Sequence, residues 1–303
     1  MSWKSWYPSW IHQMGDAVIE QAKSDYGGPK KDDLFPRDPE YRIVDVAGKG
    51  KGMIAKHRLA RGQLIFSEAP LFLYNADIKP VGLAQFYREL PAPARAALLS
   101  LANSTLPSLL PASAPEAHLG RLIDVCDTNC FDISAVLEEE VLGIFLVGSR
   151  INHSCSPNTT RYFNGKRFEF RAVRTIEVGE EITITYIDAF RPCRERQAFL
   201  WKHWRFSCHC DACKLRGGKL VESDRRRMEL KGLLRAWERH EAAGYFDRAM
   251  KLLEEEDYAS GKAQYCTRLV KALQDKGDAE ALQAWRPKLV EILTAERGPW
   301  SIE

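Results

Sequence analysis

The sequence predicts an α+β fold, because β-like and helical patterns occupy separate parts of the chain. Short runs of β-favouring residues, punctuated by glycine, fall in two blocks at 41–74 and 160–186. Apolar residues at helical spacing run through 78–147 and again through 217–303. We therefore expect a β-rich domain with a helical insertion at about 78–147, followed by an α-helical C-terminal domain.

Residues 1–40 are expected to form an N-terminal arm. They contain three tryptophans and a short helical stretch, followed by a turn-rich segment rich in glycine, proline, lysine and aspartate. Tryptophan side chains are highly buried on average, so the arm is expected to pack its indoles on the body. Three strands are predicted after it, at Tyr41–Val46, Ile54–His57 and Gln63–Glu68.

The insertion contains two predicted helices. The first is indicated by apolar side chains at helical spacing, namely Leu83, Phe86, Tyr87 and Leu90. The second is predicted to begin at Ser134, a good N-cap residue, and to end near Phe145.

The second β block begins with a predicted hairpin. Strands are expected at 160–163 and 166–173, and Asn164-Gly165 between them is a strong turn signal because both residues tolerate a positive φ. A further strand is predicted at Glu181–Tyr186. Its period of two places one set of side chains on the same face, namely Ile182, Ile184 and Tyr186.

The rest of the chain is predicted to be helical apart from a cysteine-rich segment. A helix from about Arg194 to Trp204 precedes that segment, and apolar spacing after Gly218 indicates several more helices that stack as a bundle or short solenoid. The run Arg225-Arg226-Arg227 is interpreted as a solvated helix face, with a nuclear signal or a phosphate contact as alternatives.

Composition restricts the class of protein. The 303 residues are 45% hydrophobic and 28% charged, which is ordinary for a globular protein. Because no long apolar run or signal-peptide pattern is present, an intracellular protein is expected, in the nucleus and/or cytoplasm and without a membrane partner. A net charge of +3 is too small to indicate nucleic-acid binding. The protein is also expected to be a monomer.

Four of the eight cysteines suggest a structural zinc site. Cys208, Cys210 and Cys213 form a CxCxxC cluster, and tetrahedral zinc requires a fourth ligand. Cys155 is the best candidate, because Pro157 stiffens its segment. A redox CxxC pair is the alternative, but it would give Cys208 no role. The other thiols are expected to be buried or without a special role, namely Cys126, Cys130, Cys193 and Cys266.

Four motifs follow one another along the chain: Gly48–Met53 (GKGKGM), Asn152–Asn158 (NHSCSPN), Gly179–Tyr186 (GEEITITY) and the CxCxxC cluster. In order and spacing they resemble the motifs of SET-domain lysine methyltransferases. Thr128–Phe131, the 163–173 region and the helical C-terminal region resemble the SMYD-like group in particular. That group carries a MYND zinc module, whereas residues 70–145 contain only two cysteines. The chain therefore looks more like the fungal SET proteins without this module.

The resemblance implies a domain order and a reaction. A SET domain would span 41–207 with the helical insertion, a post-SET module would hold one structural Zn²⁺ at 208–216, and a helical C-terminal domain would span 217–303. The implied reaction transfers a methyl group from S-adenosylmethionine to the ε-amine of a lysine. The implied partner is a protein substrate that carries a lysine, with histones among the candidates.

Site residues are carried over by motif. Tyr186 matches the active-site tyrosine, and the structural alternative is a tyrosine packed in the sheet. The implied cofactor-binding residues are Lys49, Gly50, Lys51, Gly52, Asn129, Asn152, His153, Tyr186 and Phe206. The glycine loop could also be a plain hairpin turn, His153 a structural hydrogen-bonding group and Phe206 a core side chain. Two other functions remain open: a catalytically silent SET-like interaction module, and a methyltransferase that acts on a small-molecule amine.

Overall fold

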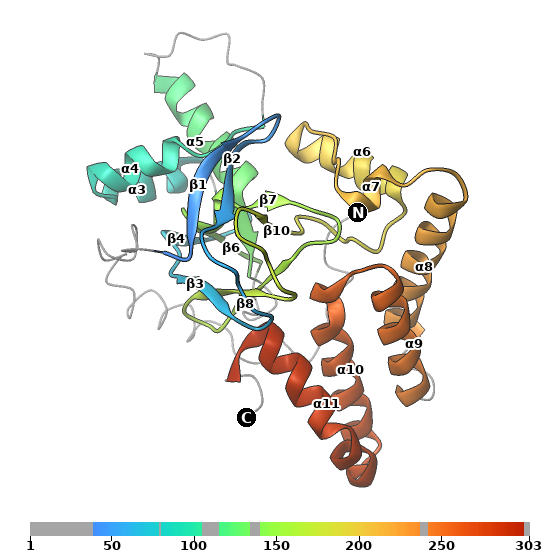
Figure 1. Ribbon diagram of the computed structural model, residues 1–303. Helices are drawn as coiled ribbons and strands as arrows, with labels where there is room; N and C mark the ends of the chain where they lie inside the picture. The colour runs from blue at the N-terminus through green and yellow to red at the C-terminus, as the bar shows by residue number, and fades with distance from the viewer. Residues whose placement is uncertain (1–38, 79, 105–114, 134–139, 237–241, 300–303) are drawn as a thin grey trace. The chain divides into compact units, whose positions relative to one another are not determined.

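The computed structural model describes residues 39–78, 80–104, 115–133, 140–236 and 242–299 (Figure 1). The expected N-terminal arm lies outside these residues except for its last two positions, and the start of the helix predicted from Ser134 lies outside them as well. The chain divides into two compact units. One contains the described residues that fall within 1–39, 67–150 and 163–169, and the other contains those that fall within 40–66, 151–162 and 170–303.

The first unit joins helices to a small antiparallel sheet. Its helices are α3 (Pro80–Glu89), α4 (Ala92–Leu99) and α5 (Pro115–Asn129), and η3 (Gly148–Arg150) is a short 3-10 helix. The sheet has the order β4-β6-β5, with β4 at Phe72–Asn75, β5 at Cys130–Asp132 and β6 at Val141–Ile144. The core between helices and sheet contains Phe72, Leu98, Leu122 and Ile144.

One prediction in this unit is wrong and one is confirmed. The expected helix at 83–90 matches α3. The helix predicted from Ser134 to Phe145 does not extend that far, because Val141–Ile144 forms β6. This strand is central, with Ile144 opposite Phe72 on one side and Cys130 on the other. Pairing on both edges outweighs the local helix preference of the glutamate-rich segment before it.

The second unit contains a four-stranded sheet that brings the sequence motifs together. Its order is β1-β2-β10-β7, with β1 at Tyr41–Val46, β2 at Gly50–Ala55, β7 at Asn152–His153 and β10 at Glu181–Ile184. The strand predicted at 41–46 is confirmed, whereas β2 begins earlier than expected. β10 lies antiparallel to β2 and parallel to β7. The glycine-rich segment, the Asn152-His153 pair and the strand before Tyr186 are therefore neighbours in one sheet.

A third sheet has the order β3-β9-β8, with β3 at Leu64–Glu68, β8 at Thr159–Phe163 and β9 at Phe168–Ala172. The predicted hairpin is present, but its turn is longer than two residues. The Asn164 side-chain oxygen accepts the backbone N–H groups of Lys166 at 3.1 Å and Arg167 at 2.9 Å. This Asx-type turn explains why β9 starts two residues later than predicted.

The C-terminal half of the second unit is helical, as predicted. After α6 (Cys193–Trp204) and the short α7 (Asp211–Lys214) come four long helices and a 3-10 turn. They are α8 (Gly217–Ala236), α9 (Ala242–Glu255), η4 (Ala259–Gly261), α10 (Lys262–Asp275) and α11 (Ala279–Arg297). Successive helices pack side by side around a common apolar core that includes Leu230, Phe246, Leu252, Leu269 and Ile292 (Figure 1).

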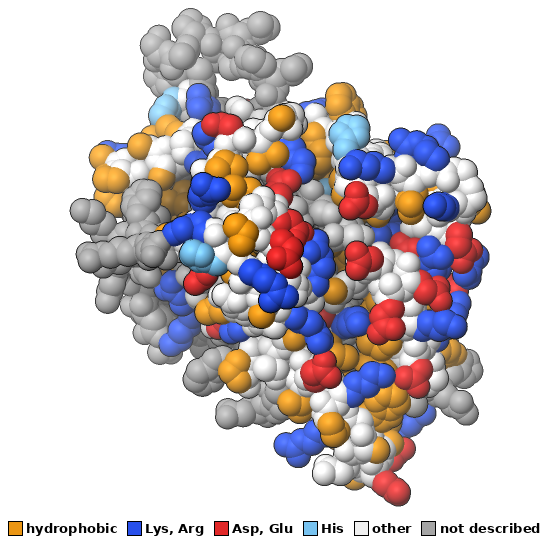
Figure 2. Space-filling view, in the orientation of Figure 1, with side chains coloured by type: hydrophobic (Ala, Val, Ile, Leu, Met, Phe, Trp, Pro, Cys, Tyr) orange, Lys and Arg blue, Asp and Glu red, His pale blue; other side chains and the backbone are white. Residues whose placement is uncertain are grey.

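The surface of these helices is mixed in charge. On the face shown in Figure 2, basic and acidic side chains are interspersed over the helical C-terminal region. Among the helices that the structure describes, none combines the length and apolar character needed to cross a membrane.

Candidate functional site

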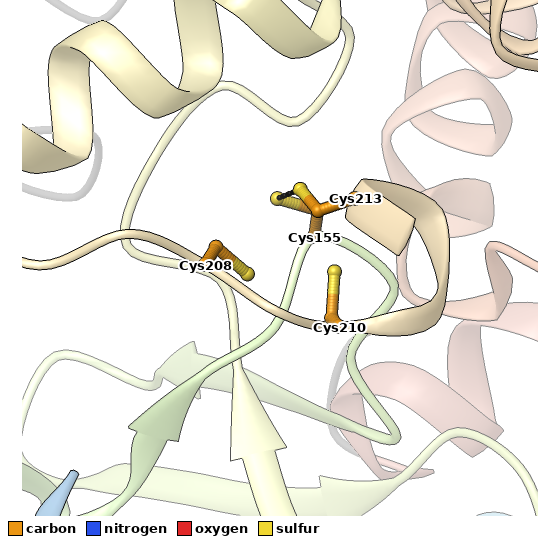
Figure 3. Close-up of side chains that lie close together, drawn as sticks. All are labelled: Cys155, Cys208, Cys210 and Cys213. Atoms are coloured by element: carbon orange, nitrogen blue, oxygen red, sulfur yellow. Dashed lines mark hydrogen bonds between the residues drawn. The ribbon is translucent and has the colours of Figure 1, made fainter. Parts of the chain in front are cut away.

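The cysteine cluster is the most sharply defined feature of the second unit. The sulfur atoms of Cys155, Cys208, Cys210 and Cys213 all lie within 4.8 Å of one another. Figure 3 shows them converging from the loop after β7, the segment before α7 and α7 itself. Tetrahedral zinc with bonds of about 2.3 Å places its sulfurs about 3.8 Å apart, and Cys155 Sγ lies 3.6 Å from Cys213 Sγ. The four thiols therefore fit one zinc ion.

Local structure places each sulfur. Gln197 of α6 brackets Cys208, accepting its N–H at 2.9 Å and donating to its carbonyl at 2.7 Å. Cys210 is the residue before α7, and its carbonyl accepts the N–H of Cys213 at 2.9 Å. The Cys155 side chain is fully buried. A short helical turn and one side-chain bracket thus hold the CxCxxC segment against a separate, buried part of the chain.

Protonation in the cluster is uneven. Hydrogen bonds with the other cysteines, Cys155 first, hold the pKa of Cys210 well below its usual range. Contacts with Cys208 and its neighbours raise the pKa of Cys155. Thiolates crowded this closely repel one another, so ionising one makes ionising the next harder. A divalent cation would remove this conflict, because coordinating thiols are deprotonated.

His153 connects this cluster to Tyr186. The Tyr186 backbone N–H donates to His153 Nδ1 at 3.1 Å, so the neutral ring carries its proton on Nε2, which lies 3.3 Å from Cys155 Sγ. Burial lowers the pKa of His153 to about 3, which keeps the ring neutral. Both ring nitrogens have internal partners, which agrees with the structural alternative for this side chain and leaves only its backbone for a ligand.

Tyr186 follows β10 rather than ending it. The strand ends at Ile184, two residues earlier than predicted. The backbone N–H of Tyr186 donates to the side chain of His153, so it is not available for pairing with a neighbouring strand. The Tyr186 hydroxyl donates to the Ile151 carbonyl at 2.6 Å. Burial raises the pKa of Tyr186, so its hydroxyl stays protonated at neutral pH and can act as a hydrogen-bond donor.

Aromatic rings gather around Tyr186. Its ring centroid lies 5.3 Å from that of His153, 5.4 Å from Trp204 and 6.5 Å from Phe206. Phe206 is half-buried and also lies 6.1 Å from the His153 ring. The structure therefore brings Phe206 to the Tyr186-His153 pair, as the motif reading expects. Trp204 is an addition that sequence reasoning missed, because it was assigned only to the end of a helix.

The glycine loop is the turn between β1 and β2. Gly48 and Gly50 have φ values of +72° and +74°, which L side chains rarely adopt. A Cβ on Gly52 would come within 2.7 Å of the Asn152 side-chain nitrogen. Lys51 pairs with Asp45 at 2.8 Å on the surface. The loop therefore approaches Asn152 closely through a position that only glycine fits.

Glu181 ties two predicted site residues together. It accepts Lys49 Nζ at 2.5 Å and the Asn152 side-chain amide at 2.9 Å. Sequence reasoning assigned Glu181 only to a strand. The signal that could have identified it is its position at the start of β10, a strand that pairs with both β2 and β7: Glu181 lies opposite Ile54 of β2, and its side chain reaches Asn152 of β7.

Asn129 lies in the first unit, at the end of α5. Its buried side-chain amide donates to the carbonyls of Ala102 at 2.6 Å and Val125 at 2.8 Å. Both amide hydrogens therefore have local partners. The other predicted site residues all belong to the second unit.

A cavity of about 720 Å³ within the second unit is lined by three of the predicted site residues, Lys49, His153 and Cys210. Its wall includes Lys49, His153, Glu181, Cys210, Glu222 and Arg226. This volume is within the range of pockets that hold small molecules of drug size.

Comparison with known proteins identifies the domain. Residues 50–187 match the family model described as "SET domain". The chain contains a SET domain. This range begins within the glycine loop and ends one residue after Tyr186, so it contains the Asn152–Asn158 and Gly179–Tyr186 motifs in full and the Gly48–Met53 motif from Gly50 onward.

Relatives of this SET protein include fungal and SMYD proteins, which confirms the resemblance stated from the motifs. It is 32% identical over 213 residues to "Histone-lysine N-methyltransferase set5" of Schizosaccharomyces pombe, covering 69% of this chain and 58% of the relative. It is 42% identical over 87 residues to human "Histone-lysine N-methyltransferase SMYD3", covering 28% of this chain and 20% of that protein. The chain thus spans less than two thirds of these relatives.

A weak likeness to a solved structure was also found. This match is to the "Structure of the Neurospora SET domain protein DIM-5, a histone lysine methyltransferase", at 17% identity and a TM-score of 0.27. It covers 50% of this chain and 53% of that one.

Proposed function

We propose that this SET protein is a lysine methyltransferase that transfers a methyl group from S-adenosylmethionine to a lysine of a protein substrate. The observation that carries this proposal is the convergence of the glycine loop, Asn152 and His153 in one sheet of the second unit, with Tyr186 hydrogen-bonded to His153 just after the strand β10. Relatives named histone-lysine N-methyltransferases support the reaction class and make histones the first candidates.

Bound S-adenosylmethionine would supply an electrophilic methyl group on a positively charged sulfur. The residues of the second unit that would hold it are Lys49, Gly50, Lys51, Gly52, Asn152, His153, Tyr186 and Phe206. Of these, the glycine loop and Asn152 already lie together, and Glu181 fixes the Lys49 and Asn152 side chains. His153 would contribute through its backbone, since both nitrogens of its ring already have hydrogen-bond partners within the protein.

Tyr186 would act on the lysine amine. The amine must be neutral to react, and deprotonating a free lysine at pH 7 costs about 4 to 5 kcal/mol. The aromatic surroundings of Tyr186 disfavour an ammonium ion by desolvation and so reduce that cost. Its hydroxyl oxygen could then orient the amine by accepting one of its N–H groups, which leaves the nitrogen lone pair free for the methyl group and keeps the hydroxyl's own bond to the Ile151 carbonyl.

The four cysteines would hold one structural zinc ion. A shell of four sulfurs leaves no open coordination position, so the metal would organise the site rather than take part in the reaction. His153 would then donate to a zinc-bound sulfur, as outer-shell partners of metal ligands commonly do. The corresponding domains are a SET domain at 41–207, a post-SET module at 208–216 and a helical domain at 217–303, acting in the nucleus and/or cytoplasm.

Calorimetry with S-adenosylmethionine tests the proposal first, because a catalytically silent SET-like module need not bind it. Absence of both heat and thermal shift at millimolar cofactor would contradict the enzyme proposal. Incubation with labelled cofactor and separate pools of histones, cell extract and free small amines then identifies the acceptor. Label in small amines alone would replace the protein-lysine assignment with the small-molecule alternative.

A further inference from the structure

Arg227 is not on the solvated face that its run of three arginines suggested. Its side chain on α8 is fully buried, whereas the side chain of Arg225 is half exposed. A buried guanidinium must find acceptors for its donors and a compensating charge, or it destabilises the fold. The position of Arg227 therefore requires an explanation.

The guanidinium of Arg227 reaches three separate parts of the chain. Its Nη1 donates to the Cys155 carbonyl at 3.0 Å and to the Ala189 carbonyl at 2.8 Å. Its Nη2 donates to Ser156 Oγ at 3.0 Å, and its Nε to Glu256 at 2.7 Å. The planar fork of arginine suits such contacts, whereas a lysine ammonium at the same place could not reach all four acceptors.

The charge of this network is balanced within the helical region. Glu256 is buried and also accepts Arg226 Nε at 2.6 Å and the Ser223 hydroxyl at 2.7 Å. Loss of Arg227 alone would therefore leave Glu256 with a positive partner. Arg227 can be changed without stranding an unpaired carboxylate, so its contacts to Cys155 can be tested separately from the charge balance.

Two further residues on α8 make similar contacts. Asp224 accepts the backbone N–H of Cys193, the first residue of α6, at 2.7 Å. Lys231 donates to Asp188 at 2.8 Å. With Arg227 they occupy positions i, i+3 and i+7, which lie on one face of a helix. This face holds the start of α6, the segment just after Tyr186 and the backbone of Cys155.

We propose that Arg227 is a positioning residue for the cysteine site. It fixes the backbone of Cys155, the one metal-ligand candidate that lies outside the CxCxxC segment, and so makes α8 part of the site's support. The helical C-terminal domain thereby determines how well the SET domain retains its metal and holds the Asn152-His153 segment. This inference rests on the proposed zinc site and does not depend on methyl transfer.

The test compares metal release from the wild-type chain and four variants, each purified and loaded with zinc. Arg227→Lys and Arg227→Met remove the fork, and Arg225→Met removes an exposed neighbour from the same run. Leu269→Ala destabilises the same helical core without touching the Arg227 contacts, because Leu269 is buried on α10. Elemental analysis gives the zinc content, a chromogenic chelator gives the release rate, and thermal unfolding gives the stability.

Both Arg227 variants are expected to release zinc about tenfold faster than wild type. This is the lower end of the loss in metal affinity that usually follows mutation of a residue supporting a metal ligand. Arg225→Met should release it at the wild-type rate. Leu269→Ala should unfold at a lower temperature, with release below that temperature close to wild type. S-adenosylmethionine affinity, measured by calorimetry, should weaken with the Arg227 variants and not with Arg225→Met.

Four results would overturn the proposal. Wild-type release rates in folded Arg227 variants would show that Cys155 needs no such support. Acceleration by Leu269→Ala equal to that by Arg227→Lys, or unfolding of both Arg227 variants where Arg225→Met is folded, would make the effect one of general stability. A wild-type protein without zinc would overturn the metal site as well, whereas zinc retention without methyl transfer would contradict only the enzyme proposal.

Discussion

The Tyr186 hydroxyl donates a 2.6 Å hydrogen bond to the backbone carbonyl of Ile151. Ile151 is completely buried and directly precedes Asn152, a predicted cofactor-binding residue. The proposed catalytic tyrosine and the proposed cofactor segment are therefore in direct contact. His153 adds a second connection through the Tyr186 backbone, so the tyrosine is held at two points.

Tyr186→Phe should lower methyl transfer by about 100-fold or more, because it removes the hydroxyl that would orient the amine. Cofactor affinity should stay within a few fold of wild type, since the ring and its aromatic neighbours remain. Losing one hydrogen bond should cost only about 1 kcal/mol of stability. Turnover is measured with labelled cofactor, affinity by calorimetry and stability by urea unfolding.

Tyr162→Phe, on β8 of the same unit, is the matched control and should leave all three quantities close to wild type. If Tyr186→Phe turns over at the wild-type rate, Tyr186 has no catalytic role.

Glu181→Gln should weaken S-adenosylmethionine binding about tenfold, which corresponds to about 1.4 kcal/mol. The variant loses the charge that pairs with Lys49, and it keeps only one of the two oxygens that accept from Lys49 (Oε2) and from Asn152 (Oε1). Both side chains would then be less well fixed before the cofactor arrives. Calorimetry measures the dissociation constant directly.

Glu177→Gln controls for a change of charge in the same region, because Glu177 is an exposed carboxylate paired with Arg58. It should not change affinity. Equal affinity of wild type and Glu181→Gln would show that the cofactor segment does not need Glu181.

The parts of the fold and the site that could be predicted from the sequence are those determined by residues close together along the chain. The CxCxxC spacing supplies three sulfurs by itself, and the stiff segment around Pro157 indicated Cys155 as a fourth. The strand at Tyr41–Val46 and the helix before the cluster also follow from local patterns. These features need little information from distant residues.

The parts that were missed depend on partners far along the chain. Arg227 lies among charged neighbours and shows no local sign of burial, because its acceptors on Cys155 and Glu256 are 72 and 29 residues away. The strand β6 has two partners that outweigh its helix-favouring flank. Glu181 acquires its role only when the sheet sets Lys49 beside Asn152. Such outcomes follow from tertiary pairing rather than from local preference.

Cys210→Ser should lose zinc and weaken the structure around the cluster. A serine hydroxyl does not provide the thiolate ligand that the site requires, and metal binding is coupled to folding. Elemental analysis should fall from about one zinc per chain to a small fraction. S-adenosylmethionine affinity should fall as well, because His153 contacts the sulfur of Cys155.

Cys130→Ser provides the control, since Cys130 lies in the first unit and outside the cluster. It should retain the metal. Full zinc content in Cys210→Ser would show that the ligand set is wrong.

The stability of the protein should fall as the pH rises from about 4.5 to 7, in part because of Glu296. This carboxyl is buried on α11, accepts the Ala263 N–H at 3.1 Å, and has its pKa raised by burial from 4.5 to about 7. The folded protein therefore keeps the proton that the unfolded chain releases. Its stabilising contribution is complete below pH 4.5 and is lost as the pH passes through 7, up to about 3 kcal/mol.

Glu296→Gln should flatten this pH dependence, because glutamine stays neutral at every pH and can still accept the Ala263 N–H. The change is measured by urea unfolding at pH 4.5, 6 and 8 for both proteins. A residual slope should remain, since burial also raises the pKa of Glu68 to about 7. Glu280→Gln, an exposed change on the same helix, should keep the wild-type profile. If Glu296→Gln follows the wild-type profile too, Glu296 ionises in the folded protein as easily as in the unfolded chain, and its burial has no electrostatic cost.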